Sequence, residues 1–174
     1  ELIWNKAPKY GNNLDFVDKH AVRLVKTFVK VLKRHTNQEG THYSANMIPT
    51  TTHLPFGELT AATPDGRLAT APLAEGISPV QGKDISGPTA VVRTMGKLDH
   101  ASTAGSLLNM KFTPKTLEGE EGLRKFASLI RSYFDMGGHH MQFNVVSKET
   151  LLDAQEHPEN YRNLLIRVAG YSDY

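Results

Sequence analysis

The most informative stretch of this sequence is Leu164-Leu165-Ile166-Arg167-Val168-Ala169-Gly170-Tyr171-Ser172-Asp173-Tyr174, in which an apolar run leads to a glycine. Its apolar opening predicts a strand over 164–168. The strand leads into Gly170, and a glycine there indicates a sharp turn, because its backbone reaches conformations that strain other residues. Taken by itself, Gly170 is expected to be a structural turn glycine.

Length, composition and charge exclude several classes of protein. The 174 residues are 39% apolar, which is enough for one domain with a core. The 20 basic and 18 acidic residues give a net charge of +2. Lys26, Lys30, Lys33 and Arg34 recur at helical spacing and are expected to form a solvated face, so we expect no nucleic-acid partner. No apolar run is long enough to cross a bilayer. The lack of cysteine excludes disulfides and thiolate metal sites and fits a cytoplasmic protein.

Apolar periodicity predicts helices in four parts of the chain. We expect them over residues 14–34, 88–98, 118–135 and 148–157. The stretch 88–98 is compatible with strand or helix, and Pro88 favours a helix. The first helix is expected to take its N-terminal cap from Asn12, Asn13 or Asp15.

Helix endings and turns follow from glycine, proline and serine. Gly137-Gly138 is expected to end the helix over 118–135, because glycine adopts the left-handed conformation of a C-terminal cap. Ser147 is expected to cap the helix over 148–157, and Pro158 to stop it. Thr63-Pro64-Asp65-Gly66 predicts a tight turn. The glycine- and proline-rich stretch 68–87 predicts a long loop, and such loops are often functional.

Extended chain is expected between these helices, over residues 42–61, 107–112, 140–145 and 164–168. In 140–145, polar His140, Gln142 and Asn144 alternate with apolar residues, which predicts a strand with one polar and one apolar face. The order of elements therefore predicts an α/β chain in which helices separate the strands.

Residue spacing alone predicts no catalytic or metal centre. His139 and His140 are adjacent and would point to opposite faces of a strand, while the other histidines lack ligand spacing, so we expect no metal site. The segment Gly76-Ile77-Ser78-Pro79 does not match a nucleophile elbow. Asp65 and Asp84 have no recognisable partner in the sequence.

Several segments, taken together and in order, resemble the C-terminal part of the glycyl radical enzymes of the pyruvate formate-lyase superfamily. They are Ala62-Thr63-Pro64-Asp65-Gly66-Arg67, Glu75-Gly76-Ile77-Ser78-Pro79-Val80-Gln81-Gly82, Gly87-Pro88-Thr89-Ala90-Val91, Lys97-Leu98-Asp99-His100, Leu107-Leu108-Asn109-Met110-Lys111-Phe112, Gly137-Gly138-His139-His140-Met141-Gln142-Phe143-Asn144-Val145-Val146, His157-Pro158-Glu159-Asn160-Tyr161 and Arg167-Val168-Ala169-Gly170-Tyr171.

The resemblance implies a role for Gly170 as the residue that carries an organic radical. In this family a partner activating enzyme, which uses S-adenosylmethionine and an iron–sulfur cluster, removes a hydrogen atom from the glycine α-carbon. No bound cofactor is implied beyond this protein-derived radical. The radical passes to a cysteine in the barrel, and the resulting thiyl radical takes a hydrogen atom from the substrate.

The resemblance also implies how the chain is organised. It predicts the C-terminal portion of a ten-stranded β/α barrel over residues 1–115 and a truncated glycine radical domain over 116–174. Because the chain has no cysteine, starts without Met and stops where the family continues into a closing helix, we expect a fragment of a larger homodimeric enzyme. Such a fragment is expected to be inactive alone.

The matching segments favour the dehydratase-like branch, which includes glycerol and trans-4-hydroxyproline dehydratases. They imply a lyase that cleaves a C–O, C–N or C–C bond, with dehydration of a small hydroxylated substrate favoured. The alternatives are a formate acetyltransferase, an arylacetate decarboxylase, a stand-alone subunit that restores the radical of a damaged enzyme, and a non-catalytic interaction domain.

Residues 46–53 are the candidate pocket segment. Strand alternation would turn either Met47, Pro49 and Thr51 or Ile48, Thr50 and Thr52 inward. Of these, Pro49 and Thr51 are the predicted substrate-pocket residues.

Overall fold

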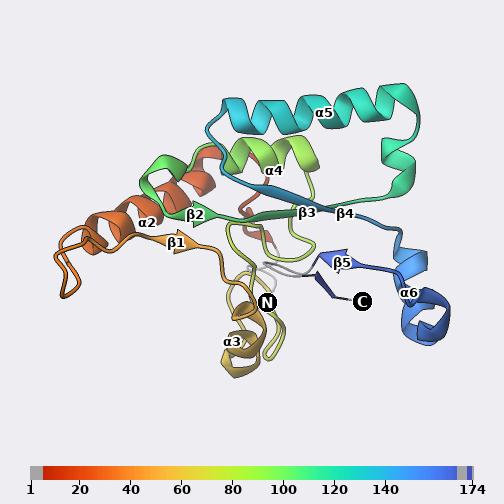
Figure 1. Cartoon of the computed structure of the whole chain (residues 1–174), viewed down its shortest axis with the longest axis horizontal. Helices are drawn as coiled ribbons and strands as arrows, with labels where there is room; N and C mark the ends of the chain where they lie inside the picture. The colour runs from red at the N-terminus through yellow and green to blue at the C-terminus, as the bar shows by residue number, and fades with distance from the viewer. Residues whose placement is uncertain (1–5, 168–171, 174) are drawn as a thin grey trace.

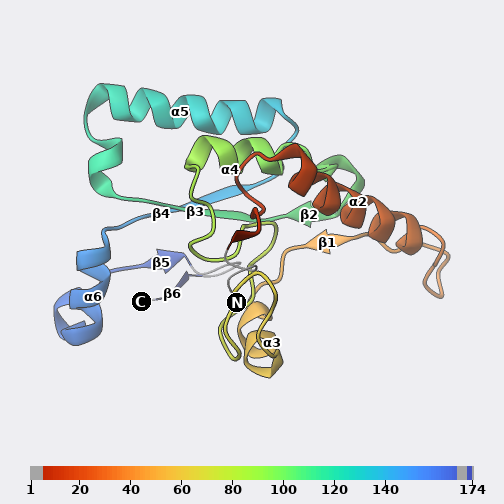
Figure 2. The ribbon, with the colours of Figure 1, turned by 180° about the vertical axis from the view of Figure 1, so that it is seen from behind.

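The computed structural model describes residues 6–167 and 172–173 and shows an α/β unit. Helices α4 (Pro88–Met95) and α5 (Gly119–Asp135) lie on one side of strands β3 (Leu108–Phe112) and β4 (Met141–Val145) (Figures 1 and 2). Helix α3 (His53–Leu59) and the pair β5 (Ile166–Arg167) and β6 (Ser172–Asp173) lie on the other side.

Parallel pairing organises the centre of the unit. Strand β3 pairs with β4 in a register that runs from Leu108 opposite Met141 to Phe112 opposite Val145. Helix α5 makes the crossover that a parallel pair requires. Strand β1 (Asn46–Met47) pairs in parallel with β2 (Gly105–Ser106), which Leu107 alone separates from β3. Residues 105–112 therefore pair with β1 at their start and with β4 afterwards.

Alternate residues of β3 form the centre of the hydrophobic core. Leu108, Met110 and Phe112 are buried and belong to the core cluster. Helices α4 and α5 complete that cluster from one side of the strands, which leaves the opposite face of β3 free for polar residues. The core cluster also contains Ile77, Val91, Val92, Met95, Leu98 and Tyr133.

The structure confirms the four predicted helices. Helix α2 (Asp15–Leu32) and helix α5 lie within the predicted ranges 14–34 and 118–135, and α4 begins at Pro88 as predicted. Helix α6 (Lys148–Glu156) begins after Ser147, whose Oγ accepts a hydrogen bond from the Thr150 amide at 3.0 Å. The predicted cap is thus confirmed.

Turns and helix endings also agree with the sequence. The amide of Gly66 donates to the Thr63 carbonyl at 3.1 Å and closes the predicted turn. Gly137 follows α5 with a φ of 87°, the left-handed geometry that glycine tolerates. Pro158 opens a short 3₁₀ helix, η3 (Pro158–Tyr161), after α6 has ended. Two further 3₁₀ turns are η1 (His100–Ser102) and η2 (Pro114–Leu117).

The predicted strands over 107–112 and 140–145 are confirmed as β3 and β4. Met141 and Phe143 pack against the core, while Gln142 is buried on the polar face, as the alternation predicts. His140 lies just before the strand. Of the predicted strand over 164–168, the structure confirms Ile166–Arg167.

The predicted N-terminal cap of α2 is wrong. Leu14 occupies the cap position and no side chain accepts a bond there. The Asn12 side chain is engaged elsewhere, because Nδ2 donates to the Lys83 carbonyl at 2.8 Å and Oδ1 accepts from the Ser86 amide at 2.9 Å. Asn12 therefore ties the start of the chain to the distant loop, and Asp15 instead contacts Lys97.

The prediction of extended chain over 42–61 is also wrong for its second half. Only β1 is a strand, and His53–Leu59 forms helix α3. Pro55 does not prevent this helix, because it lies in the first turn, where the backbone amides have no intrahelical acceptor. Gly57 allows the chain to pass closely, since a Cβ there would lie 2.6 Å from the Ala71 carbonyl oxygen.

Two buried polar clusters connect the helices. The Asp18 carboxylate of α2 accepts hydrogen bonds from Lys97 at 2.6 Å and from Thr94 at 3.2 Å. The His100 ring lies 2.8 Å from both the Met95 carbonyl, through Nε2, and the Ser106 hydroxyl, through Nδ1. Both ring nitrogens of His100 are therefore used to hold the fold.

Candidate functional site

The predicted long loop over 68–87 is confirmed and is fastened to the polar side of the strands. The Ile77 amide donates to the Leu107 carbonyl at 3.0 Å, and the Asn109 amide donates to the Ser78 hydroxyl at 3.1 Å. These bonds place the segment 75–78 directly against β3.

A buried arginine fixes the start of this loop. The Arg67 guanidinium donates through Nη1 to the carbonyls of Leu68 and Ala71 and through Nη2 to those of Thr60 and Ala61. One planar group with several donors in a fixed geometry can hold several carbonyls at once. Arg67 thus joins the end of α3 to the loop.

A backbone hydrogen bond also joins the start of helix α3 to the loop. The Leu73 amide donates to the His53 carbonyl at 3.1 Å, so the first residue of α3 lies beside the segment that leads to Glu75. His53 and Glu75 are 8% and 7% exposed, respectively. Two titratable side chains of low exposure, 22 positions apart in the sequence, therefore lie on segments that a backbone hydrogen bond connects.

A cavity of about 850 Å³ is lined by residues of this loop, of β3 and β4, and of the starts of α3 and α4. Its polar lining includes His53, Glu75, Ser78, Gln81, Asp84, Asn109, Lys111 and Asn144, and its apolar lining includes Leu54, Pro72, Pro79, Val91, Met110 and Phe112. A cavity of this volume with an apolar wall and a few polar groups suits a small organic molecule.

Glu75 is one of two groups in the cavity wall whose pKa is shifted by burial. Its burial raises the pKa of the carboxyl above the usual range, and a hydrogen bond with the Asn109 side chain opposes that rise. Its Oε2 is buried and has no hydrogen-bond partner among the described residues. Burial thus favours a protonated carboxyl, which can donate a hydrogen bond as well as accept one.

Burial shifts the pKa of His53 in the opposite direction to that of Glu75. Burial lowers the pKa of its imidazole, so the neutral ring is favoured. Its Nδ1 is buried, and the described part of the chain offers it no hydrogen-bond partner. A neutral imidazole and a carboxyl that burial favours protonated can bind hydroxyl groups or exchange a proton with a ligand.

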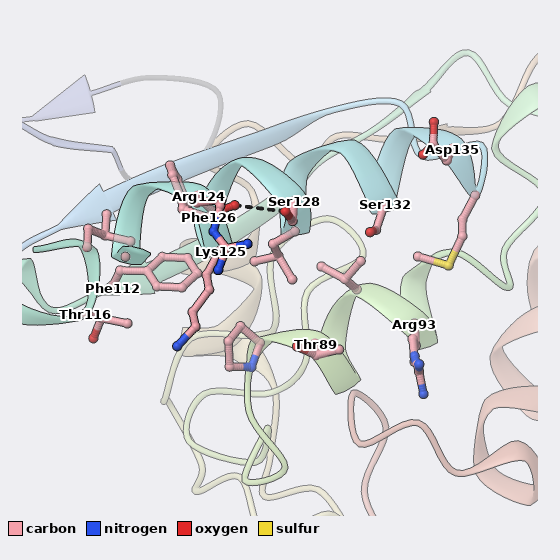
Figure 3. Close-up of a pocket in the computed structure, with 16 residues that line it drawn as sticks. Thr89, Arg93, Phe112, Thr116, Arg124, Lys125, Phe126, Ser128, Ser132 and Asp135 are labelled. Atoms are coloured by element: carbon pink, nitrogen blue, oxygen red, sulfur yellow. Dashed lines mark hydrogen bonds between the residues drawn. The ribbon is translucent and has the colours of Figure 1, made fainter. Parts of the chain in front are cut away.

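A second cavity, of about 800 Å³, lies between α4 and α5. Figure 3 shows Arg93 and Thr89 on α4 and Arg124, Lys125, Ser128, Ser132 and Asp135 along α5. Its charged residues lie on the outer helices, and none of them is among the buried polar residues. The groove therefore lacks the buried titratable pair that distinguishes the first cavity.

The predicted site residues fall in two groups. Gly170 lies outside the described residues. Pro49 is half-buried and Thr51 is exposed, and both carbonyls accept amide bonds in the turn that starts α3, from Thr52 and Leu54. Neither Pro49 nor Thr51 lines the cavity beside Glu75. Their role in binding substrate stays a prediction.

Sequence reasoning missed His53 and Glu75. His53 carries no ligand spacing, and Glu75 is one carboxylate in a long loop. The available signal was a charged residue inside a glycine- and proline-rich loop, since such loops often carry function. No three His, Asp or Glu side chains in the described residues lie close enough together to hold a metal ion. Nor does any helix within that part of the chain have the length and apolar character needed to cross a membrane.

Comparison with known proteins identifies the family. Residues 73–174 match the family described as Glycine radical, and residues 1–57 match the family described as Pyruvate formate lyase-like. The chain therefore belongs to the glycine radical family, as the resemblance in sequence predicted. Its relatives are glycyl radical enzymes with dehydratase, lyase and decarboxylase names.

Three similar proteins show the range of the family. The chain is 46% identical over 173 residues to trans-4-hydroxy-L-proline dehydratase of Clostridioides difficile, covering 99% of this chain and 22% of the relative. It is 45% identical over 180 residues to isethionate sulfite-lyase of Nitratidesulfovibrio vulgaris, covering 100% and 21%. A solved structure described for 1,2-propanediol dehydration in Roseburia inulinivorans superposes with a TM-score of 0.94 at 50% identity, covering 98% and 22%. The chain thus spans about a fifth of the length of the relatives it matches.

Proposed function

We propose that this chain is the C-terminal part of a glycyl radical lyase, in which Gly170 stores the radical used to dehydrate a small hydroxylated substrate. The observation that carries the proposal is the position of Gly170 inside residues 73–174, which match the Glycine radical family. The antiparallel register of β5 and β6 supports it, because Arg167 lies opposite Ser172 and both ends of the intervening segment are held together.

The chemistry follows from hydrogen-atom transfers. A partner activating enzyme that uses S-adenosylmethionine and an iron–sulfur cluster supplies the step that removes one hydrogen atom from the Gly170 α-carbon. The radical is delocalised over the flanking amide nitrogen and carbonyl, and no side chain hinders its flattening. Gly170 then takes a hydrogen atom from the thiol of a cysteine upstream of this chain. The resulting thiyl radical takes a hydrogen atom from a substrate carbon, and after loss of water the product radical recovers that atom from the thiol.

The proposal assigns the described α/β unit to a larger architecture. Residues 1–115 would contribute to the end of a ten-stranded β/α barrel, with β3 among its parallel strands, and residues 116–174 would form the glycine radical domain. In the full-length protein we expect a cytoplasmic homodimer. The active enzyme requires the cysteine that this chain lacks, so the chain alone is expected to be inactive.

Dehydration is favoured among the possible reactions because a relative at 46% identity is a dehydratase by name and a solved structure at 50% identity is described for dehydration. The sulfite-lyase relative shows that a comparably similar chain can serve another bond cleavage. Formate acetyltransferase and arylacetate decarboxylase chemistry are the alternatives within the superfamily. A screen of hydroxylated substrates against the activated full-length protein separates these reactions by their products.

The test of Gly170 is electron paramagnetic resonance of the full-length protein after anaerobic activation. We expect a glycine-centred signal that disappears in Gly170→Ala and persists in Glu39→Ala, a control variant at an exposed position. Air exposure should then cut the activated chain at Gly170, as fragment masses would show. A full signal in Gly170→Ala, or an intact chain after loss of the signal in air, would overturn the assignment.

A further inference from the structure

Helix α2 carries a stripe of positive charge on its exposed side. Four basic residues follow one another at intervals of four, three and four positions, which places them on one face of the helix: Lys19, Arg23, Lys26 and Lys30. All four are exposed, and none of them forms an ion pair with another described residue. They line a groove of about 630 Å³ beside Lys97, whose own charge is already paired with Asp15 and Asp18.

Helix α6 carries the opposite charge at the same spacing. Its three acidic residues follow at intervals of four and three positions and are exposed: Glu149, Asp153 and Glu156. Within the described residues, none of these carboxylates is paired with a cation. Asp153 accepts a hydrogen bond from the Tyr161 hydroxyl. Hydrogen bonds from its own backbone amide and from Ser147 lower the pKa of Glu149, so this carboxyl is ionised near neutral pH.

The two stripes cannot pair with each other inside one copy of the protein. Helices α2 and α6 lie at opposite ends of the long axis of the molecule (Figures 1 and 2). Each stripe is bordered by an exposed apolar side chain, Phe16 on α2 and Leu152 on α6, which are 55% and 50% exposed. Protein interfaces combine such apolar contacts with complementary charge. Both helix faces therefore have the composition of a contact surface for another molecule.

We propose that α2 of one copy docks against α6 of a second copy of this protein. Two copies that lie side by side in opposite directions form this contact twice, since each brings its basic end to the acidic end of the other. Such an arrangement has two-fold symmetry and closes on itself. The spacing matches when the two helices run antiparallel, because three pairs then face one another: Glu149 with Lys30, Asp153 with Lys26, and Glu156 with Arg23.

A second copy explains more of the surface than another polyanion does. A nucleic acid or an unrelated acidic protein would use the stripe on α2 and leave the stripe on α6 without a partner. A nucleic acid would also be repelled by the carboxylates of α6. A second copy uses both stripes at once, and the intervals within them agree. The inference goes beyond radical storage, and it assigns a specific contact to the expected homodimer.

The test is the dissociation constant of the dimer, measured by mass photometry and analytical ultracentrifugation on the full-length protein without activation. The variants Arg23→Glu/Lys30→Glu and Glu149→Lys/Glu156→Lys each place like charges across both contacts. Each should therefore raise the dissociation constant at least about tenfold. An equal mixture of the two variants should recover the wild-type constant, because every reversed charge then faces a reversed partner.

Matched controls reverse charge at exposed positions on other helices. Glu58→Lys on α3 and Arg131→Glu on α5 should dimerise like the wild type. Unchanged dimerisation of the α2 and α6 variants would overturn the inference, and so would a loss that mixing does not restore. Unchanged dimerisation together with slower activation of Arg23→Glu/Lys30→Glu would assign the basic stripe to the activating enzyme instead.

Cross-linking of the wild-type protein removes any dependence on variants that fail to fold. A carbodiimide joins a lysine amine to a carboxylate that it contacts, with loss of water. We expect products that join Lys26 or Lys30 to Glu149 or Asp153. Because α2 and α6 lie at opposite ends of one copy, such a product connects two copies. A dimer that yields no product between these helices would also overturn the inference.

The outcomes separate this inference from the proposed function. The dimer is measured without a radical, so a contact that depends on α2 and α6 stands even if activation gives no signal on Gly170. A normal Gly170 signal in a protein whose dimer is indifferent to both pairs of substitutions would overturn the contact and leave the radical function intact.

Discussion

Replacing Lys97 by methionine should leave the Asp18 carboxylate buried without its cation. Lys97 Nζ lies 2.6 Å from Asp18 Oδ2 and 2.7 Å from Asp15 Oδ1. The two carboxylates differ in burial, since the Asp18 side chain is 0% exposed and that of Asp15 is 95% exposed. Burial by itself would lower the pKa of Lys97, but the hydrogen bonds to Asp15 and Asp18 raise it, so the lysine stays charged near neutral pH.

The magnitude follows from this difference in burial. Removing one partner of a buried ion pair costs about 3–5 kcal/mol, because the remaining charge is neither solvated nor paired. The hydrogen bond that the Thr94 hydroxyl donates to Asp18 at 3.2 Å would remain. At about 1.4 kcal/mol for each tenfold change, the opening equilibrium of α2 should shift by roughly a hundredfold to a few thousandfold.

Amide hydrogen exchange in the full-length protein measures this opening directly, because it reports local stability without requiring global two-state unfolding. In Lys97→Met the protected amides of α2 and α4 should exchange faster by that factor. Asp15→Asn removes an equally short contact at an exposed position and should leave exchange unresolved from the wild type. The double variant Asp18→Asn/Lys97→Met should recover protection. Equal exchange in Lys97→Met and Asp15→Asn would refute the reasoning that burial sets the cost.

Two further perturbations test the packing and the buried histidine. Gly138→Ala would place a Cβ 2.3 Å from the ring of Tyr133, a fully buried side chain that cannot move aside. The variant should destabilise the fold by about 1–3 kcal/mol and lower the melting temperature. An unchanged melting temperature would contradict this. Burial lowers the pKa of His100 below the usual histidine value, so its contribution to stability is complete above about pH 6.5 and is lost as the pH falls through the lowered pKa in the fold. Thermal unfolding between pH 7.5 and 5 should show this loss of stability. The control His140→Gln should reproduce the wild-type profile. A melting temperature that does not change with acid would count against a neutral buried ring.

The helices could be predicted from sequence because their signals are local. The apolar spacing in α2 and α5, Pro88 before α4 and Ser147 before α6 each act within a few residues. Helix α3 was missed for the opposite reason. It is short, contains Pro55, and is stabilised by contacts with a loop that follows it, including the bond from the Leu73 amide. Short helices depend on such tertiary contacts more than on propensity.

The candidate site likewise includes one residue that the sequence could predict and two that it could not. Gly170 was predicted as the radical residue from the flanking segments that resemble the family, and the family itself is confirmed. Glu75 and His53 could not be assigned to one cavity from the sequence, because their common place in its wall depends on the path of the loop and on Arg67. Burial, which shifts the pKa of both groups, is a property of the folded chain.

The two faces of β3 connect the core to this cavity. Leu108 and Met110 belong to the core cluster, and Asn109 between them contacts Glu75 and, like Met110, lines the cavity. Because side chains alternate along a strand, a slip of one residue against β4 would exchange the two faces and bring Asn109 into the core. The apolar contacts that fix the register of β3 therefore also fix the position of Asn109 and, through it, the orientation of the Glu75 carboxyl. Stability of the core and geometry of the cavity are thus set by the same pairing.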